Sequence, residues 1–262
     1  MTNLLISSSV TRNLKESALL AEELKMGIEI SRLPNFKNIH NDFDGILNQL
    51  EKDLSNFNGF KSLHGMFFDQ SIASNDPEIR AISQKRHSQS LKAAQVIGAK
   101  IVVFHSGHKG MKHRVSQEKF KKNSILFWKE FIEEFEKSNI TAVIENVLER
   151  DYKLILDIIS EVNSPYLKAS IDIGHANLFS EVDICDWIDA YGKHLHHMHI
   201  HNNYGDDDSH YSLLNGSIDF CKVFDKLKQT NSNPAIVFEI FEKKDLIESV
   251  NYYNKCMETQ NV

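Results

Sequence analysis

The chain has 262 residues, of which 41% are hydrophobic and 25% are charged, and its formal net charge is −6. This composition suits one large α/β domain or two small ones, and the acidic balance argues against a protein that binds nucleic acid mainly by electrostatic attraction. No apolar run reaches the ~18 to 20 residues of a membrane span and the start lacks a secretory signal pattern, so we expect a cytoplasmic protein with no membrane partner.

Short apolar segments of strand composition alternate with longer segments of helical periodicity along the whole chain. We predict eight strands, at residues 4–8, 27–31, 60–64, 100–105, 141–145, 167–172, 195–201 and 235–239. We predict eight helices after them, at residues 12–25, 43–56, 77–97, 116–137, 151–161, 182–191, 219–229 and 244–257. Asp76 and Gly98 flank the third of these helices, and they are typical of a helix start and a helix end.

The regular order of these segments predicts the fold class. Eight βα units in about 250 residues describe a (β/α)8 TIM barrel, since a doubly wound sheet would seldom need so many regular repeats. No linker rich in Pro, Gly or Ser and no low-complexity segment interrupts the chain. Residues 1–262 are therefore predicted to form a single TIM-barrel domain.

The three cysteines, Cys185, Cys221 and Cys256, lie far apart in the sequence and form no CxxC pair. This spacing indicates neither a disulfide framework nor a zinc site made of thiolates. We expect all three to be reduced residues on helices.

The ends of the predicted strands carry side chains that bind metal ions. In a (β/α)8 barrel the reacting groups lie where strands end and the following loops begin. Six consecutive strands, the third to the eighth, finish in such a side chain. The residues are His64, His105, Glu145, Asp172 with His175, His199 with His201, and Glu239, and the loop after the seventh strand adds Asp208 and His210. We therefore expect a site for divalent cations at this end of the barrel.

These candidates differ in strength when each is considered alone. Glu145 and Glu239 follow four or five apolar strand residues, so their carboxylates are expected to be desolvated and to need a cation or hydrogen-bond donors. His64 and His105 could equally be hydrogen-bonded histidines at the barrel mouth. Asp172 could simply cap the next helix.

Residues 195–210, LHHMHIHNNYGDDDSH, hold the highest density of potential ligands in the chain. Alternation along a strand directs His197, His199 and His201 to one face and Met198 and Ile200 to the other. In the acidic run at 206–208 we expect one bound carboxylate and two solvated ones.

The motifs VVFHSG, AVIENV, SIDIGHANL and HMHIHNNYGDDDSH resemble those of the xylose-isomerase-like TIM barrels, called AP endonuclease family 2 in the broad sense. This family includes endonuclease IV and many sugar and sugar-phosphate isomerases and epimerases. The resemblance covers nearly the whole chain. In the endonuclease IV branch nine side chains hold three zinc ions, which implies His64, His105, Glu145, Asp172, His175, His199, Asp208, His210 and Glu239 here. Single-metal epimerases use a smaller set, which implies Glu145, Asp172, His199 and Glu239.

The chain also departs from the endonuclease pattern. It reads ENVLERD where that enzyme reads ENTAG, DIGH in place of DTCH, and HIHNN in place of HLND. No DNA-intercalating loop is identifiable, and residues 66–100 instead resemble family members described as sugar phosphate isomerases. A small phosphorylated or sugar substrate is therefore expected, and nucleic acid stays open as a partner without being favoured.

Two chemistries fit this ligand set. The preferred one is hydrolysis of a phosphodiester or sugar phosphate by a metal-activated water at a site of up to three Zn²⁺ or Mn²⁺ ions, with Glu145, Glu239 and Asp172 as the central residues. The alternative is isomerisation or epimerisation of a sugar or sugar phosphate with one Mn²⁺, Co²⁺ or Mg²⁺, in which Glu145 and Glu239 act as acid and base. His201, Lys109 or Arg150 would then contact the substrate. A barrel that keeps metal for structure alone and only binds is the third hypothesis.

Overall fold

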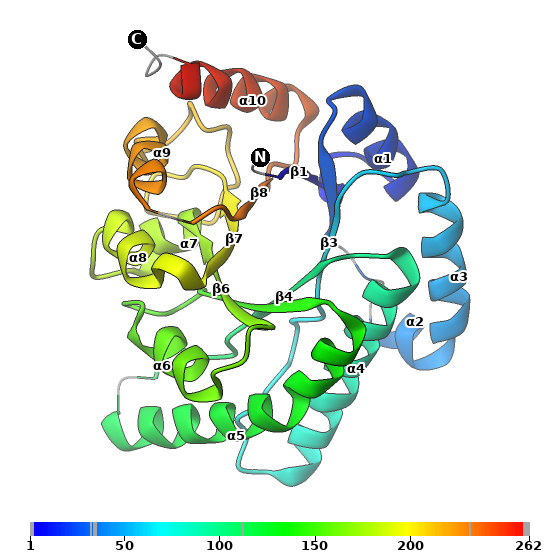
Figure 1. The fold of residues 1–262 in the computed structure, drawn as a ribbon, viewed down its shortest axis with the longest axis vertical. Helices are drawn as coiled ribbons and strands as arrows, with labels where there is room; N and C mark the ends of the chain where they lie inside the picture. The colour runs from blue at the N-terminus through cyan, green and yellow to red at the C-terminus, as the bar shows by residue number, and fades with distance from the viewer. Residues whose placement is uncertain (1–2, 32, 34–35, 112, 231, 259–262) are drawn as a thin grey trace.

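Eight parallel strands close into a barrel that is surrounded by helices (Figure 1). The computed structural model describes residues 3–31, 33, 36–111, 113–230 and 232–258. The strands follow one another in sequence order around the barrel, and β8 pairs with β1 to close it. The predicted (β/α)8 barrel is confirmed.

The strands agree with the predicted ones to within one residue at every end. They are β1 (Leu4–Ser7), β2 (Gly27–Ile30), β3 (Lys61–His64), β4 (Ile101–His105), β5 (Thr141–Glu145), β6 (Leu167–Asp172), β7 (Leu195–Ile200) and β8 (Ala235–Phe238). His201 and Glu239 therefore lie one residue beyond their strands.

The described helices include two that the periodicity did not predict, α2 and α7. The helices are α1 (Leu14–Glu23), α2 (Phe36–Asn41), α3 (Phe43–Leu54), α4 (Pro77–Ile97), α5 (Arg114–Ser138), α6 (Lys153–Val162), α7 (Ile173–Phe179), α8 (Ile184–Tyr191), α9 (Phe220–Gln229) and α10 (Lys243–Glu258). Both unpredicted helices have seven residues or fewer, which is too short for an amphipathic period to show. Short 3-10 turns follow β1 (Ser8–Val10) and precede β7 (Gly192–His194).

Alternation along the strands separates two apolar regions. Val102 and Phe104 face outward and pack with helix residues such as Trp128 and Phe131 in the main core. Their neighbours face inward and fill the lower barrel, where a smaller apolar cluster comprises Leu5, Ile101, Val103, Val143, Ala235 and Val237. The interior of the barrel is thus a packed core at its N-terminal end.

A polar layer lies above this interior cluster, toward the C-terminal ends of the strands. Its members are fully buried and come from five strands: Ser7, Glu29, Ser62, Ser170 and His197. Ser7, Glu29 and Ser62 are direct register partners on β1, β2 and β3. This layer forms the base on which the candidate site rests.

The structure corrects the expectation for two of the cysteines. Cys221 on α9 and Cys256 on α10 form a disulfide, with their Cα atoms 5.5 Å apart. Cys185 is free and buried, as expected. The pair was missed because 35 residues separate the two cysteines, and only the return of the chain through β8 places α10 against α9.

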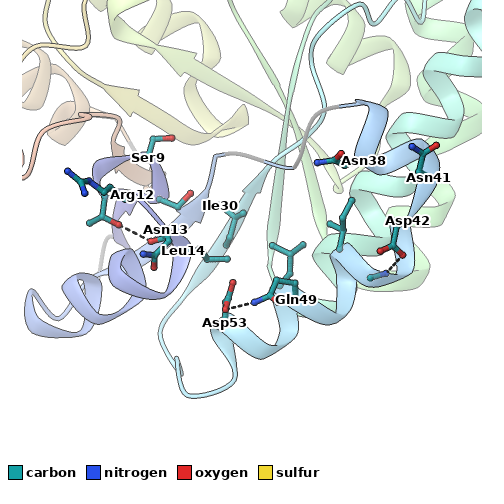
Figure 2. A pocket seen from close by; sticks show the side chains of 15 residues that line it. Ser9, Arg12, Asn13, Leu14, Ile30, Asn38, Asn41, Asp42, Gln49 and Asp53 are labelled. Carbon is teal, nitrogen blue, oxygen red and sulfur yellow. Dashed lines mark hydrogen bonds between the residues drawn. The ribbon is translucent and has the colours of Figure 1, made fainter.

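A hollow of about 560 Å³ lies outside the barrel, between α1 and helices α2 and α3 (Figure 2). Its polar groups are mostly engaged locally, because Asn13 caps the backbone of Glu16 and Asp42 caps that of Gly45. They do not converge on a common point as ligands would. No helix within the described ranges is long and apolar enough to cross a membrane.

Candidate metal centre

A cavity of about 650 Å³ opens at the C-terminal end of the barrel. Imidazole and carboxylate groups from the strand ends and the following loops form its floor, and its walls are largely apolar. The floor residues are His64, His105, Glu145, His175, Asp208, His210 and Glu239, and the wall residues include Leu33, Met66, Phe67, Phe68 and Phe241. The cavity therefore lies where the sequence predicted the site.

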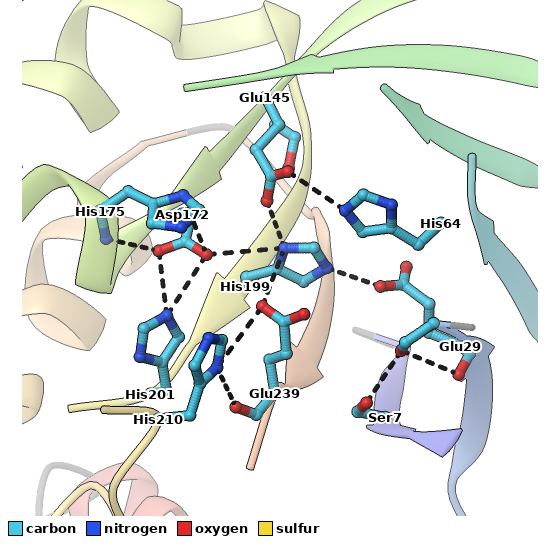
Figure 3. Close-up of polar contacts among 12 residues, drawn as sticks. Ser7, Glu29, His64, Glu145, Asp172, His175, His199, His201, His210 and Glu239 are labelled. Carbon is cyan, nitrogen blue, oxygen red and sulfur yellow. Dashed lines mark hydrogen bonds and ion pairs between the residues drawn. The ribbon is translucent and has the colours of Figure 1, made fainter. Parts of the chain in front are cut away.

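His199 on β7 lies among three carboxylates at the base of this cavity (Figure 3). Its Nδ1 atom is hydrogen-bonded to Oε1 of Glu145. The same nitrogen is 3.5 Å from Oε2 of Glu239 and 3.7 Å from Oδ2 of Asp172. The side chains of Glu145 and Asp172 are fully buried, and that of Glu239 is 12% exposed. Three desolvated carboxylates around one imidazole nitrogen carry more negative charge than that imidazole can neutralise.

Glu145 also faces two histidines on the neighbouring strands. Its Oε2 atom is 3.5 Å from Nε2 of His64 on β3 and 3.2 Å from Nε2 of His105 on β4. Among the described residues this buried oxygen has no hydrogen-bond partner of acceptable geometry. Since a buried carboxylate oxygen normally has a donor or a cation, this orphaned atom fits the binding of a metal ion.

A second part of the cluster surrounds Asp208. Its Oδ2 atom is 3.3 Å from Nε2 of His175 and 3.2 Å from Nε2 of His210. Asp206 and Asp207 are exposed. Asp208 thus belongs to the cluster, whereas its two acidic neighbours face solvent.

The turn from β6 into α7 holds Asp172 in place. Its Oδ1 atom accepts a hydrogen bond from the backbone N–H of His175 at 2.7 Å and so caps α7. The side chain of Asn146 pairs with both backbone groups of Asp172, at 2.8 and 3.0 Å. Asp172 therefore caps α7, as the alternative interpretation proposed, and it also lies within the ligand cluster.

Gly174 in the same turn is required by a close approach of two segments. A Cβ atom at this position would lie 1.9 Å from Cε1 of His201. His201 is fully buried, its Nε2 atom is 3.2 Å from Oδ1 of Asp172, and its ring stacks on His210 with the centroids 3.9 Å apart. Glycine therefore lets α7 pack directly against the His201 ring.

Glu29 was not among the predicted site residues, and it is fully buried on β2. Its carboxylate accepts hydrogen bonds from Nε2 of His199 at 2.6 Å, Nε2 of His197 at 3.0 Å and Oγ of Ser62 at 2.8 Å. A signal was available, because GIEI places a carboxylate within an apolar strand just as AVIE does for Glu145. β2 lies outside the run of strands, the third to the eighth, whose ends carry the predicted ligands.

The three residues considered as substrate contacts do not line the described part of the cavity. His201 is fully buried beside Asp172. Lys109 is exposed on the loop after β4. Arg150 is exposed, forms an ion pair with Glu181 and lines a different hollow beside α6. This placement does not support substrate contact, because His201 is enclosed by its neighbours and the chain carries Lys109 and Arg150 outward after β4 and β5.

The imidazoles of the cluster keep the carboxylates of Glu145 and Asp172 ionised. Burial alone would raise the pKa of Glu145, but His199, His105 and His64 together outweigh burial and hold that pKa well below its ordinary value. Burial also opposes ionisation of Asp172, yet His175 and other imidazoles lower its pKa to about 2. In His199 itself burial disfavours the charge, while Glu239 and the neighbouring carboxylates raise its pKa well above the usual range. Buried, ionised carboxylates of this kind favour the binding of a divalent cation.

Four overlapping groups at the cavity floor bring three ligand atoms each within 4.8 Å of one another. The groups are His64–His105–Glu145, Glu145–Asp172–His175, Asp172–His199–Glu239 and His201–His210–Glu239. The nine residues implied by the resemblance therefore lie in one cluster, with Asp208 joined to it through His175 and His210. Mixed imidazole and carboxylate donors suit Zn²⁺ and Mn²⁺, and this donor set fits a divalent metal.

The fold and this cluster define a TIM barrel with a candidate metal site at its catalytic face. The family model described as "Xylose isomerase-like TIM barrel" matches residues 24–256, and the chain belongs to this family. The resemblance seen in the motifs is therefore confirmed. A relative in Methanocaldococcus jannaschii, "Uncharacterized protein MJ1311", is 25% identical over 206 residues, which cover 76% of this chain and 70% of the relative.

Solved structures share the fold at low sequence identity. A "D-tagatose 3-epimerase-like protein" has a TM-score of 0.82 and 22% identity, covering 100% of this chain and 98% of that one. A protein from Thermus thermophilus, solved after soaking with ZnCl2, has a TM-score of 0.80 and 20% identity, with coverage of 97% and 96%. An "L-ribulose 3-epimerase" has a TM-score of 0.75 and 20% identity, with coverage of 96% and 86%. At these identities the likeness shows the fold alone.

Proposed function

We propose that the protein is a metal-dependent sugar isomerase or epimerase that moves a proton at a carbon next to a carbonyl group. The observation that carries this proposal is the convergence of Glu145, Asp172 and Glu239 on Nδ1 of His199 at the cavity floor. The names of the solved neighbours, which include sugar epimerases, favour this alternative over the phosphoester hydrolysis that ligand count alone had ranked first.

The same four residues would hold the metal ion. They offer one imidazole nitrogen and three carboxylates from β5, β6, β7 and the residue after β8. When bound, a divalent metal supplies Lewis-acid polarisation of the carbonyl and hydroxyl oxygens of a substrate. Asp172 is held firmly for this role, because Asn146 bonds to its backbone and the start of α7 bonds to its carboxylate.

Glu145 and Glu239 would carry the proton transfers. Both line the cavity, whereas Asp172 does not, so both can reach a bound substrate. Glu145 is held ionised by the neighbouring imidazoles and is therefore available as a base. One glutamate removes the proton from the carbon beside the carbonyl, and the other returns a proton to that carbon from the opposite face or to the adjacent carbon. The first outcome is epimerisation and the second is isomerisation.

The walls of the cavity suit a sugar as the substrate. Phe67 lies against His105 with ring centroids 4.6 Å apart, and Phe241 stacks on His210 at 4.3 Å. A sugar has one apolar C–H face, which packs on aromatic rings, and an edge of hydroxyl groups, which would point to the floor. His64 and His105 are placed to hydrogen-bond such hydroxyl groups.

Proton exchange with solvent tests this proposal directly. The protein, loaded in turn with Mn²⁺, Co²⁺, Mg²⁺ or Zn²⁺, is incubated in D₂O with D-tagatose, L-ribulose, other ketoses and ketose phosphates. We expect deuterium at one carbon next to the carbonyl of at least one sugar, measured by proton NMR and mass spectrometry, without phosphate release. Glu145→Gln should lower the exchange rate by at least about 100-fold, because general acid–base groups contribute that much or more.

The matched control is Glu181→Gln, which removes a carboxylate from the outside of the barrel, where it pairs with Arg150. This variant should exchange deuterium at the wild-type rate. Absence of exchange with every sugar, in protein shown by elemental analysis to contain metal, would contradict the proposal. An exchange rate that survives in Glu145→Gln would remove this glutamate from the mechanism.

Hydrolysis of a phosphoester is the second candidate, and one observation favours it. The cluster holds more ligands than one ion needs, since His64 and His105 form one group with Glu145 while His210 lies in another with Glu239. Two or three ions in this arrangement could activate water and bind phosphate oxygens. Elemental analysis of protein purified without added metal separates the candidates, because about three ions per chain favour hydrolysis and one favours proton transfer.

A further inference from the structure

The two ring nitrogens of His199 face different surroundings. Nδ1 points toward Glu145, Asp172 and Glu239, the carboxylates of the proposed metal site. Nε2 points down into the barrel and lies 2.6 Å from Oε1 of Glu29. An imidazole that binds a metal through one nitrogen carries its proton on the other, so an acceptor at that second nitrogen favours the metal-binding form.

Glu29 is an acceptor on both of its oxygens. Oε1 accepts a hydrogen bond from His199, and Oε2 accepts hydrogen bonds from Nε2 of His197 at 3.0 Å and from the hydroxyl of Ser62 at 2.8 Å. His197 is oriented in turn by Ser170, whose Oγ lies 2.9 Å from Nδ1. An ionised carboxylate can only accept, so each of these contacts must place the hydrogen on the partner.

Burial makes this arrangement rigid. Glu29, His197 and His199 are all 0% exposed, and Ser62 and Ser170 are equally buried. A carboxylate without water is tolerated in a protein interior only where donors compensate its charge, and here three donors do so. Glu29 therefore cannot turn away from His199 without leaving a buried charge unpaired.

We propose that Glu29 is a positioning residue for the metal site, which fixes His199 in the tautomer with the proton on Nε2 and so presents the Nδ1 lone pair to the metal. Glu29 is not among the residues that line the cavity, so it would act on the metal site through His199. The inference rests on the metal-dependent site proposed above and assigns a role to the buried carboxylate beneath that site. Carboxylates behind ligating imidazoles orient the ring and make it a stronger ligand.

Glu29, His197 and His199 also bring three ligand atoms within 4.8 Å, which raises the alternative of a second buried metal site. Hydrogen bonding explains the group more completely, because each donor in it faces one acceptor. Ser62 and Ser170 complete the pattern, and they are hydroxyl groups that a metal site of this kind would not need. The geometry therefore points to an orienting network and not to a second ion.

Zinc affinity measured on Glu29→Gln tests the proposal without reference to activity. The amide keeps the shape of the side chain, but it has no negative charge and only one accepting oxygen for three donors. Calorimetric titration with Zn²⁺ should show binding weaker by roughly 10- to 100-fold, the usual effect of removing such a partner. Wild-type affinity in Glu29→Gln would overturn the proposal.

Ser170→Ala is the matched control, because it removes a hydrogen bond from His197 in the same buried layer and leaves the Glu29–His199 contact in place. Its Zn²⁺ affinity should stay within about twofold of wild type. Equal losses in both variants would mean that any damage to the layer weakens binding, and the specific role of Glu29 would be rejected. Thermal unfolding of both apoproteins verifies that each variant is folded.

Nitrogen-15 NMR of the Zn²⁺-loaded wild type provides a second measurement that needs no variant. We expect His199 to be metal-bound at Nδ1 and protonated at Nε2, and the opposite pattern would overturn the proposal. Both measurements are independent of the sugar chemistry. If no sugar is epimerised but Glu29→Gln binds Zn²⁺ more weakly, the proposed function fails and the role of Glu29 stands.

Discussion

Gly174→Ala adds one methyl group at the point where α7 meets His201. The new Cβ would lie 1.9 Å from Cε1 of His201, and 2.5 and 2.6 Å from its two ring nitrogens. Because carbon atoms in contact are normally ~3.5 to 4.0 Å apart, the two groups must separate by about 1.6 Å or more. His201 is fully buried and has His210 stacked on one side, so it has little room to move away.

We expect this substitution to cost about 1 to 3 kcal/mol of unfolding free energy, as overpacking of an interior usually does. For a chain of this size the melting temperature should fall by roughly 2 to 12 °C, since each kcal/mol shifts it by about 2 to 4 °C. Displacement of His201 also removes its contact with Asp172, so Zn²⁺ affinity should fall by about 10-fold or more.

Thermal unfolding and calorimetric titration with Zn²⁺ measure both effects. The control is Gly98→Ala at the end of α4, where φ is +71° and the new methyl group meets nothing within 4 Å. That variant should lose about 1 to 2 kcal/mol of stability through backbone strain and keep its Zn²⁺ affinity. Wild-type stability and Zn²⁺ affinity in Gly174→Ala would refute the close approach of Gly174 to the His201 ring.

Two further predictions concern the core and the disulfide. Burial lowers the pKa of His87 to about 4, against a weaker opposing effect of its hydrogen bond to Ser83, so the unfolded chain binds more protons than the folded one between pH 6.5 and pH 4. As pH falls through this window the wild type should lose about 3 kcal/mol of unfolding free energy that His87→Leu does not lose. Equal losses in the two proteins, measured by denaturant unfolding at both ends of the window, would contradict this. Reduction of Cys221–Cys256 should lower the unfolding free energy by about 3 to 4 kcal/mol, the loop entropy of 35 residues, and a Cys221→Ser variant should not respond to reductant. Detection of three free thiols by mass spectrometry in unreduced protein would rule out the bond.

The barrel could be predicted from the sequence because its signals are local. An apolar strand such as IVVFH at 101–105 and an amphipathic helix such as residues 77–97 each show their period within a few turns. Their regular alternation leaves few topologies to choose from. Helices α2 and α7 were missed because six or seven residues are too few for such a period.

The candidate site could be predicted only in part. His64, His105, Glu145 and Glu239 were recognisable because parallel strands bring their C-terminal ends to one face of the barrel. Lys109 and Arg150 follow the same strands, but their loops carry them outward to solvent and to other partners. The direction of a side chain on a loop depends on contacts with residues distant in the sequence, and the periodicity of the sequence does not predict these contacts.

The sequence by itself determined the alternation of strands and helices, the closed barrel, and the imidazoles and carboxylates at its strand ends, since each of these is written in residue type and spacing. Only the tertiary structure decided that Nδ1 of His199 faces three carboxylates while Nε2 faces Glu29, and that Cys221 meets Cys256. The physical reason is that these contacts join residues far apart along the chain, 170 positions apart for Glu29 and His199, and only the packing of the closed barrel and its helices brings them together.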